Sequence, residues 1–109
     1  MELEYTSMSE ARKIIRANER VILFNSFPGC TTCAPTERAL LNSKDEILGV
    51  VIIKINSLDS AELLGELGIR ANGSLTFIKN GEKQGRLITD KANDILGLYD
   101  LHFVSSTDK

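Results

Sequence analysis

The stretch VILFNSFPGCTTCAP, residues 21–35, joins a run of apolar strand formers to the only two cysteines of the chain. The apolar run, residues 21–24, is too short for a buried helix and is typical of a strand covered on both faces. Cys30 and Cys33 come soon after it, where we expect a helix to open. Open α/β sheets carry their sites at the carboxyl ends of the strands, so the cysteine pair is the candidate site.

The rest of the chain alternates predicted helices and strands. Ser7 and Glu10 have the spacing of a capping box and predict a helix that runs to about Asn18, after a weak strand around Leu3. The further expected elements are helix 37–43, strand 50–55, helix 59–67, strands 75–78 and 82–88, and a last helix to residue 103. Asn80 and Gly81 predict a two-residue hairpin turn with positive φ at both positions, and Asp90 is the expected N-cap of the last helix.

This order predicts one α/β domain, residues 1–109, with parallel strands joined by helical crossovers and an antiparallel hairpin at the end. Residues 104–109 are the expected flexible tail. The sheet should therefore be mixed, with helices around it.

The composition of the chain limits the classes of function that we expect. The chain has 109 residues, 42% of them hydrophobic and 26% charged, as in ordinary soluble domains. A net charge of −2 without a basic stripe argues against nucleic acid as a partner. Neither a signal peptide nor a membrane-spanning run is visible, so we expect a cytoplasmic protein with no membrane partner. In that reducing compartment, a close cysteine pair is typical of catalysis or metal binding.

The expected helix start gives the two cysteines different roles. The N-terminus of a helix favours a thiolate over a thiol, which predicts Cys30 as the attacking nucleophile. Cys33, one turn later, is then the resolving thiol that breaks the mixed disulfide. We expect no metal site, since zinc needs further ligands and the only histidine, His102, is distant and without a predicted role.

Four short motifs lie at characteristic distances from one another along the chain: Cys30-Thr31-Thr32-Cys33 after a buried strand, Lys54-Ile55-Asn56, Gly68-Ile69-Arg70 and Lys79-Asn80-Gly81-Glu82. On these motifs, the chain resembles a thioredoxin over nearly its whole length. The resemblance implies a thioredoxin-like fold with a four- to five-stranded sheet flanked by helices. It also implies reversible dithiol–disulfide exchange with protein substrates.

The chain departs from the thioredoxin pattern around the cysteines. Thioredoxins usually carry Trp-Cys-Gly-Pro-Cys, whereas two threonines stand between these cysteines and the chain has no tryptophan. The threonines either donate hydrogen bonds to the sulfur or cap the helix. The family's buried aspartate, which assists proton removal from the resolving thiol, aligns with Phe24. Its lysine partner aligns with Lys54, and without the acid we expect the Lys54 head to lie in water.

The family's cis-proline, which lies beside the disulfide, aligns with Gly73. A non-proline cis bond costs ~2.5–4 kcal/mol, so we expect a trans Asn72–Gly73 peptide and a more open wall facing the cysteines. Proline at position 73 should then restore the rigid wall and improve turnover. The alternative is that Asn72 and Gly73 form a plain turn with positive φ, which proline would disrupt.

We therefore predict a monomeric thiol–disulfide oxidoreductase with no cofactor besides the redox-active disulfide Cys30–Cys33. Its substrate would be a disulfide in another protein, or a small glutathione-type disulfide, with electrons supplied by a separate reductase. The candidate substrate-binding residues are Phe27, Pro28, Gly29, Thr31, Asn72 and Gly73. Two alternatives stay open: a non-catalytic thioredoxin-fold binding module, and a metal or iron–sulfur cluster shared by two chains, for which Gly73 would leave room.

Overall fold

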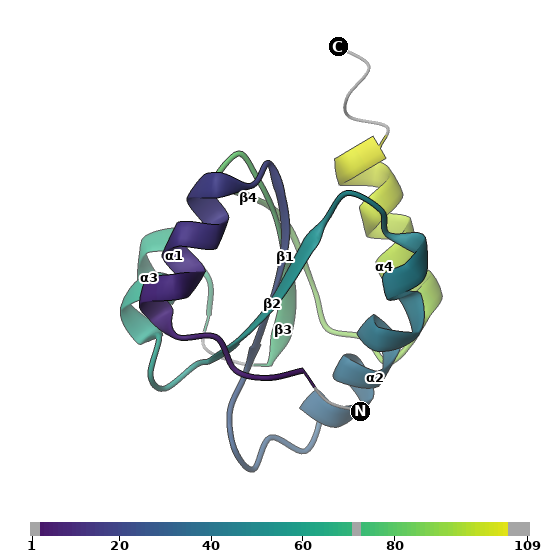
Figure 1. Cartoon of the computed structure of the whole chain (residues 1–109). Helices are drawn as coiled ribbons and strands as arrows, with labels where there is room; N and C mark the ends of the chain where they lie inside the picture. Colours follow the sequence, from purple (N-terminus) through teal and green to yellow (C-terminus); the bar gives the residue numbers. More distant parts are fainter. Residues whose placement is uncertain (1–2, 71–72, 105–109) are drawn as a thin grey trace.

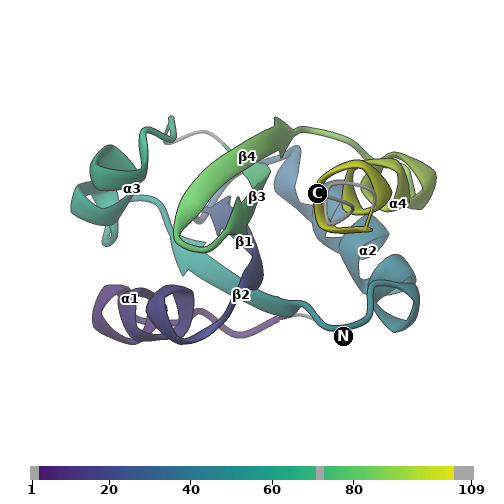
Figure 2. The same ribbon diagram turned by 90° about the horizontal axis from the view of Figure 1, so that it is seen from above.

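The computed structural model describes residues 3–70 and 73–104. Four strands form one sheet in the order β2-β1-β3-β4, and helices cover both of its faces (Figure 1, Figure 2). The strands are β1 (Arg20–Ser26), β2 (Val51–Asn56), β3 (Ser74–Lys79) and β4 (Glu82–Leu87). The α-helices are α1 (Met8–Ala17), α2 (Cys33–Ser43), α3 (Ala61–Leu67) and α4 (Ala92–Tyr99), with a 3-10 turn at Lys44–Glu46 and a π-helical turn at Asp100–Val104.

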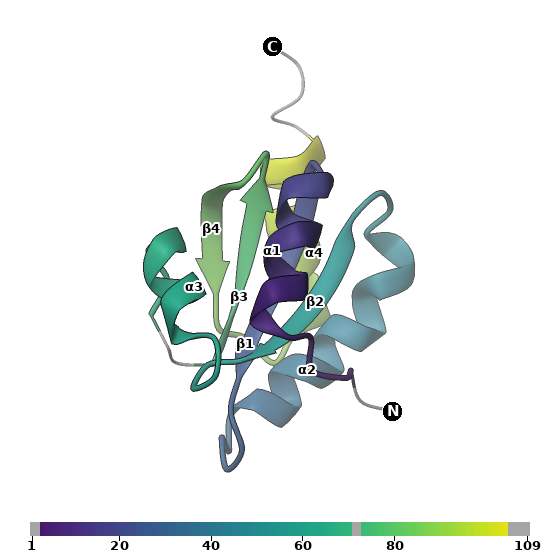
Figure 3. The same cartoon turned by 60° about the vertical axis from the view of Figure 1, so that its left-hand side comes forward.

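The sheet is mixed, as predicted. β1 runs parallel to β2 and antiparallel to β3, and β3 pairs with β4 as an antiparallel hairpin. Asn80 and Gly81 form the hairpin turn with φ values of 54° and 83°, which confirms the predicted positive φ at both positions. Figure 3 shows that β1 ends and β3 begins at one edge of the sheet, beside the loop that leads into α2.

The central strand β1 separates two apolar cores. Val21 and Leu23 point to the core under α1 and α3, whereas Ile22 and Phe24 point to the core under α2 and α4. All four side chains are fully buried. This alternation is the reason for the continuous apolar run, because a strand with a helical layer on each face has no solvent side.

The amino-terminal prediction is confirmed in part. Ser7 caps α1, with its Oγ accepting a hydrogen bond of 3.1 Å from the Glu10 N–H. The expected strand around Leu3 is reduced to a single parallel bridge between Tyr5 and Lys54, in which the Thr6 N–H donates to the Lys54 carbonyl at 2.7 Å. No helix in residues 3–70 and 73–104 is long and apolar enough to cross a membrane.

The last helix begins differently from the prediction. α4 starts at Ala92, and Asp90 does not cap it. Instead the Thr89 hydroxyl accepts a hydrogen bond from the Lys91 N–H at 3.0 Å and donates to the Asp94 carboxylate at 2.6 Å. One hydroxyl therefore joins the residue before α4 to a carboxylate in the first turn of the helix.

At its far end α4 continues into the π-helical turn. Val104, expected in the flexible tail, is the last residue of that turn, because buried Phe103 anchors it against the ring of Phe77. The remainder of the expected tail lies outside the described residues. His102 is half-buried.

Candidate functional site

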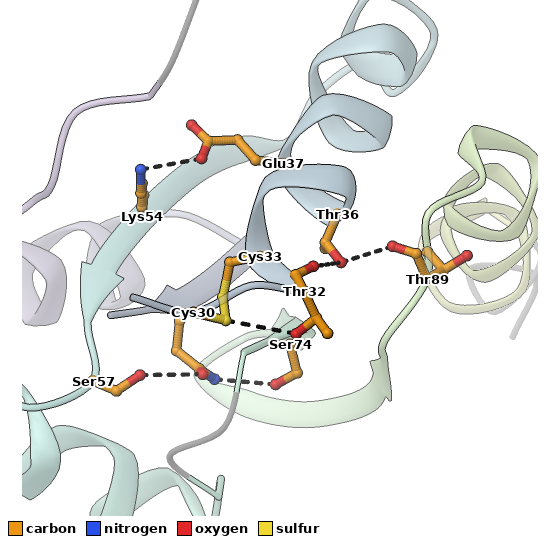
Figure 4. Close-up of a disulfide and its surroundings, with 10 residues drawn as sticks. Cys30, Thr32, Cys33, Thr36, Glu37, Lys54, Ser57, Ser74 and Thr89 are labelled. Atoms are coloured by element: carbon orange, nitrogen blue, oxygen red, sulfur yellow. Dashed lines mark hydrogen bonds and ion pairs between the residues drawn. A yellow bond between two sulfur atoms is a disulfide. The ribbon is translucent and has the colours of Figure 1, made fainter. Parts of the chain in front are cut away.

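The two cysteines form a disulfide between the end of β1 and the start of α2, with their Cα atoms 5.4 Å apart (Figure 4). Cys33 is the first residue of α2 and is only 5% exposed, whereas Cys30 is half-buried in the preceding loop. A nucleophile must be reachable and a resolving thiol need not be, so this burial agrees with the predicted division of roles.

Helix α2 was expected from residue 37 but begins at Cys33. The difference arises at Pro35, which is tolerated in the first turn because the N–H groups there have no partner within the helix. Cys30 therefore precedes the helix instead of opening it, and the Cys33 N–H donates to the Cys30 carbonyl at 3.4 Å. The disulfide still holds the Cys30 sulfur at the helix start.

A tight turn presents Cys30. The Cys30 N–H donates to the Phe27 carbonyl at 3.1 Å, with Pro28 and Gly29 at the two central positions. Gly29 has a φ of 87°, and proline followed by a residue of positive φ is the signature of a type II turn. Pro28 and Gly29 are exposed and Phe27 is half-buried, so these predicted substrate-binding residues also have a structural role.

We expect Gly29→Ala to lower the free energy of unfolding by about 1–2 kcal/mol, because an L-residue is strained at positive φ. Nothing lies within 4 Å of a Cβ at this position, so the cost is conformational and not steric. Urea denaturation measures it. The control is Gly97→Ala, at an open helical site, which should stabilise by up to about 1 kcal/mol. Equal effects of the two substitutions would contradict the type II turn.

Gly73 lies directly against the disulfide. A Cβ built at Gly73 would overlap Cys33 Sγ and lie 3.1 Å from Cys30 Sγ. The expected open wall is therefore wrong, because the glycine lets the backbone itself close on the sulfurs. Asn72, and with it the Asn72–Gly73 peptide, lies outside the described residues.

A chain of hydrogen-bonded polar side chains links β1, β3 and β4 to Ser57, the residue after β2. Asn25 is fully buried at the end of β1, where its amide donates to Ser74 Oγ at 3.1 Å and accepts from Ser57 Oγ at 3.3 Å. Arg86 Nε also donates to Ser74 Oγ, at 3.2 Å. These bonds hold the residue next to Gly73 in place. Sequence reasoning missed them, although a polar Asn25 after four apolar strand residues was a usable signal.

The expectation that the Lys54 head lies in water is wrong. Lys54 is 7% exposed, and its Nζ lies 3.1 Å from Glu37 Oε1 on α2 (Figure 4). The other carboxylate oxygen of Glu37 accepts from the Leu3 N–H at 2.6 Å, and Lys54 Nζ donates to the Leu3 carbonyl at 3.3 Å and lies 4.6 Å from the ring centre of Tyr5. Glu37 on α2 is thus the acidic partner of Lys54, and the pair fastens the amino-terminal segment.

Two further exposed apolar residues, which were not predicted as site residues, lie at the end of the sheet where β1 ends. Leu58 is 73% exposed and follows Ser57, whose N–H donates to the Ser26 carbonyl at 2.7 Å. Ile88 is 52% exposed and follows β4, whose last residue pairs with Leu75 near the start of β3. Apolar residues just beyond strand ends were the available signal. These two residues and Pro28, which follows β1, are called the apolar rim below, because each lies just beyond a strand that ends at the disulfide end of the sheet.

A concave pocket lies at the opposite end of the sheet, between α1, α3 and the hairpin turn. Arg12 and Arg16 both line it, and Arg12 is already compensated by Glu66 at 2.6 Å and Glu62 at 3.8 Å. The hydrogen bond from Arg12 lowers the pKa of Glu66. Within residues 3–70 and 73–104, no three metal-ligating side chains gather. The disulfide is therefore the candidate site.

No family model matches the sequence, and no curated protein matches it significantly. Solved structures do match. The oxidised thioredoxin of Plasmodium falciparum is 21% identical with a TM-score of 0.78, covering 92% of this chain and 97% of that one. Thioredoxin f2 of Chlamydomonas reinhardtii is 17% identical with a TM-score of 0.77, covering 94% and 97%. Oxidised thioredoxin O2 of Arabidopsis thaliana is 14% identical with a TM-score of 0.76, covering 93% of each chain.

These similarities confirm the predicted fold class. The chain has the thioredoxin fold, with a Cys-x-x-Cys disulfide at the carboxyl end of its central strand.

Proposed function

We propose that this protein is a thiol–disulfide oxidoreductase that acts on disulfides of other proteins through Cys30 and Cys33. The observation that carries the proposal is the disulfide at the carboxyl end of β1, with one half-buried and one buried sulfur. Such an arrangement separates the attacking from the resolving thiol.

The exchange needs only the two sulfurs. In the reduced protein, the Cys30 thiolate attacks one sulfur of the substrate disulfide, and the other substrate sulfur leaves as a thiolate. The Cys33 thiolate then attacks Cys30 Sγ, which releases the second substrate thiolate and forms the Cys30–Cys33 disulfide. Two electrons pass to the substrate, whose two thiolates take up protons from solvent. A separate reductase must return two electrons.

The surface around the disulfide supports a protein substrate. The residues of the apolar rim are exposed and follow strands that end at the disulfide end of the sheet, and exposed apolar groups are typical of protein contact sites where they form a patch. We further propose a monomer that works in the cytoplasm, since the pair would be kept reduced there. A small glutathione-type disulfide is the alternative substrate and would contact fewer residues of the apolar rim.

Trapping tests the proposal. In Cys33→Ser, attack by Cys30 can occur but resolution cannot, so we expect covalent adducts with protein substrates that dithiothreitol releases. The double variant Cys30→Ser/Cys33→Ser should trap nothing. Mass spectrometry of the adducts distinguishes proteins from glutathione. A Cys33→Ser protein without any adduct, together with a wild-type protein that cannot reduce insulin disulfides, would leave a binding module instead.

A further inference from the structure

Thr32 stands in the N-cap position of α2 but does not cap it. Its backbone is helical, with φ −91° and ψ −8°, and its side chain makes no capping hydrogen bond. A capping residue would be extended, with its hydroxyl turned to the N–H groups of the helix. The sequence left open whether the threonines cap the helix or face the sulfur, and for Thr32 capping is excluded.

The Thr32 hydroxyl faces the nucleophile instead. Its Oγ1 lies 3.6 Å from Cys30 Sγ (Figure 4). A sulfur in a disulfide carries no hydrogen, so the hydroxyl is the donor. Thr31, also exposed and also between the cysteines, makes no hydrogen bond in the part of the chain that the structure describes.

The backbone carbonyl of Thr32 makes a second contact, with α2. The Thr36 hydroxyl donates to the Thr89 carbonyl at 2.7 Å and lies 3.2 Å from the Thr32 carbonyl, so it bridges the two. Thr36 is 3% exposed. The position of residue 32 is therefore tied to the segment before α4, and its hydroxyl does not depend on the cysteine loop alone for its place.

We propose that the Thr32 hydroxyl stabilises the Cys30 thiolate of the reduced protein and thereby sets the balance between dithiol and disulfide. This inference rests on the proposed function. A hydrogen bond to a charged acceptor is roughly twice as strong as one to a neutral acceptor, so the bond gains strength when the disulfide is reduced.

Thr32→Val removes the hydroxyl at nearly constant shape. We expect the acid dissociation constant of Cys30 to fall about tenfold, which is a rise in its pKa of about one unit. The equilibrium with glutathione should shift toward the Cys30–Cys33 disulfide by up to about tenfold, or roughly 30 mV. Thiolate absorbance against pH gives the first quantity, and redox titration the second.

Two further variants make the test specific. Thr31→Val is the matched control and should leave both quantities unchanged, whereas Thr32→Ser keeps the hydroxyl and should restore wild-type values. The proposal is overturned if Thr32→Val changes neither quantity, or if Thr31→Val changes them equally. Both readouts concern the dithiol itself and need no substrate. Failure of the proposed function would instead appear as absent adducts in the Cys33→Ser trap.

Discussion

Replacing Glu37 with leucine is expected to lower the free energy of unfolding by about 3–5 kcal/mol, since it leaves Lys54 as a buried charge without its partner. Glu37 and Lys54 are each 7% exposed, and water cannot readily replace the lost carboxylate. The Leu3 N–H loses its acceptor as well. For a domain whose total stability is about 5–15 kcal/mol, this is a large fraction. Urea denaturation monitored by circular dichroism measures the loss.

Two control variants isolate the contribution of the Glu37–Lys54 ion pair to stability. Glu46 is exposed in the 3-10 turn, and Glu46→Leu should change stability by less than about 0.5 kcal/mol. The double variant Glu37→Leu/Lys54→Met removes both charges and should recover most of the stability, because an apolar pair carries no desolvation cost. A loss below about 1 kcal/mol in Glu37→Leu would mean that Lys54 reaches water.

Gly73→Ala should destabilise the oxidised protein by about 1–3 kcal/mol, the usual cost of forcing an atom into a packed site. The added Cβ overlaps Cys33 Sγ, and a sulfur held in a disulfide has no free rotation by which to move away. In the reduced protein the sulfurs can separate, so the cost there should be smaller. Denaturation of both redox forms gives the two values.

The difference between the two forms also appears as a reduction potential. A substitution that costs the disulfide form more than the dithiol raises the potential, here by roughly 20–60 mV for an unequal cost of about 1–3 kcal/mol. Gly65→Ala, at an open site on α3, is the control and should leave the potential unchanged. An equal loss of stability in both forms would contradict the proposed contact between residue 73 and the sulfurs.

The close approach of Gly73 to the sulfurs also reverses the expected effect of Gly73→Pro. The sequence predicts that Gly73→Pro restores a rigid wall and improves turnover. Proline carries a Cβ just as alanine does, and at the observed backbone position no Cβ fits. Proline would therefore have to displace either the loop or the disulfide.

The sequence by itself determined the features that depend on neighbouring residues. The Ser7 cap, the Asn80-Gly81 turn and the buried run in β1 follow from local hydrogen bonding, backbone preference and apolar periodicity. The position of the cysteine pair after that strand followed in the same way. These features give the element order, and the order limits the fold to few topologies.

Only the tertiary structure decided what surrounds the sulfurs. Glu37 meets Lys54 because α2 packs over the end of β2, and Gly73 meets Cys33 because β3 starts where β1 ends. Each meeting joins residues distant in the chain, and their spacing carries no local signal. Whether a charge is paired, or a Cβ has room, depends on the packing of whole elements to within about an ångström, because folded interiors are nearly as dense as crystals.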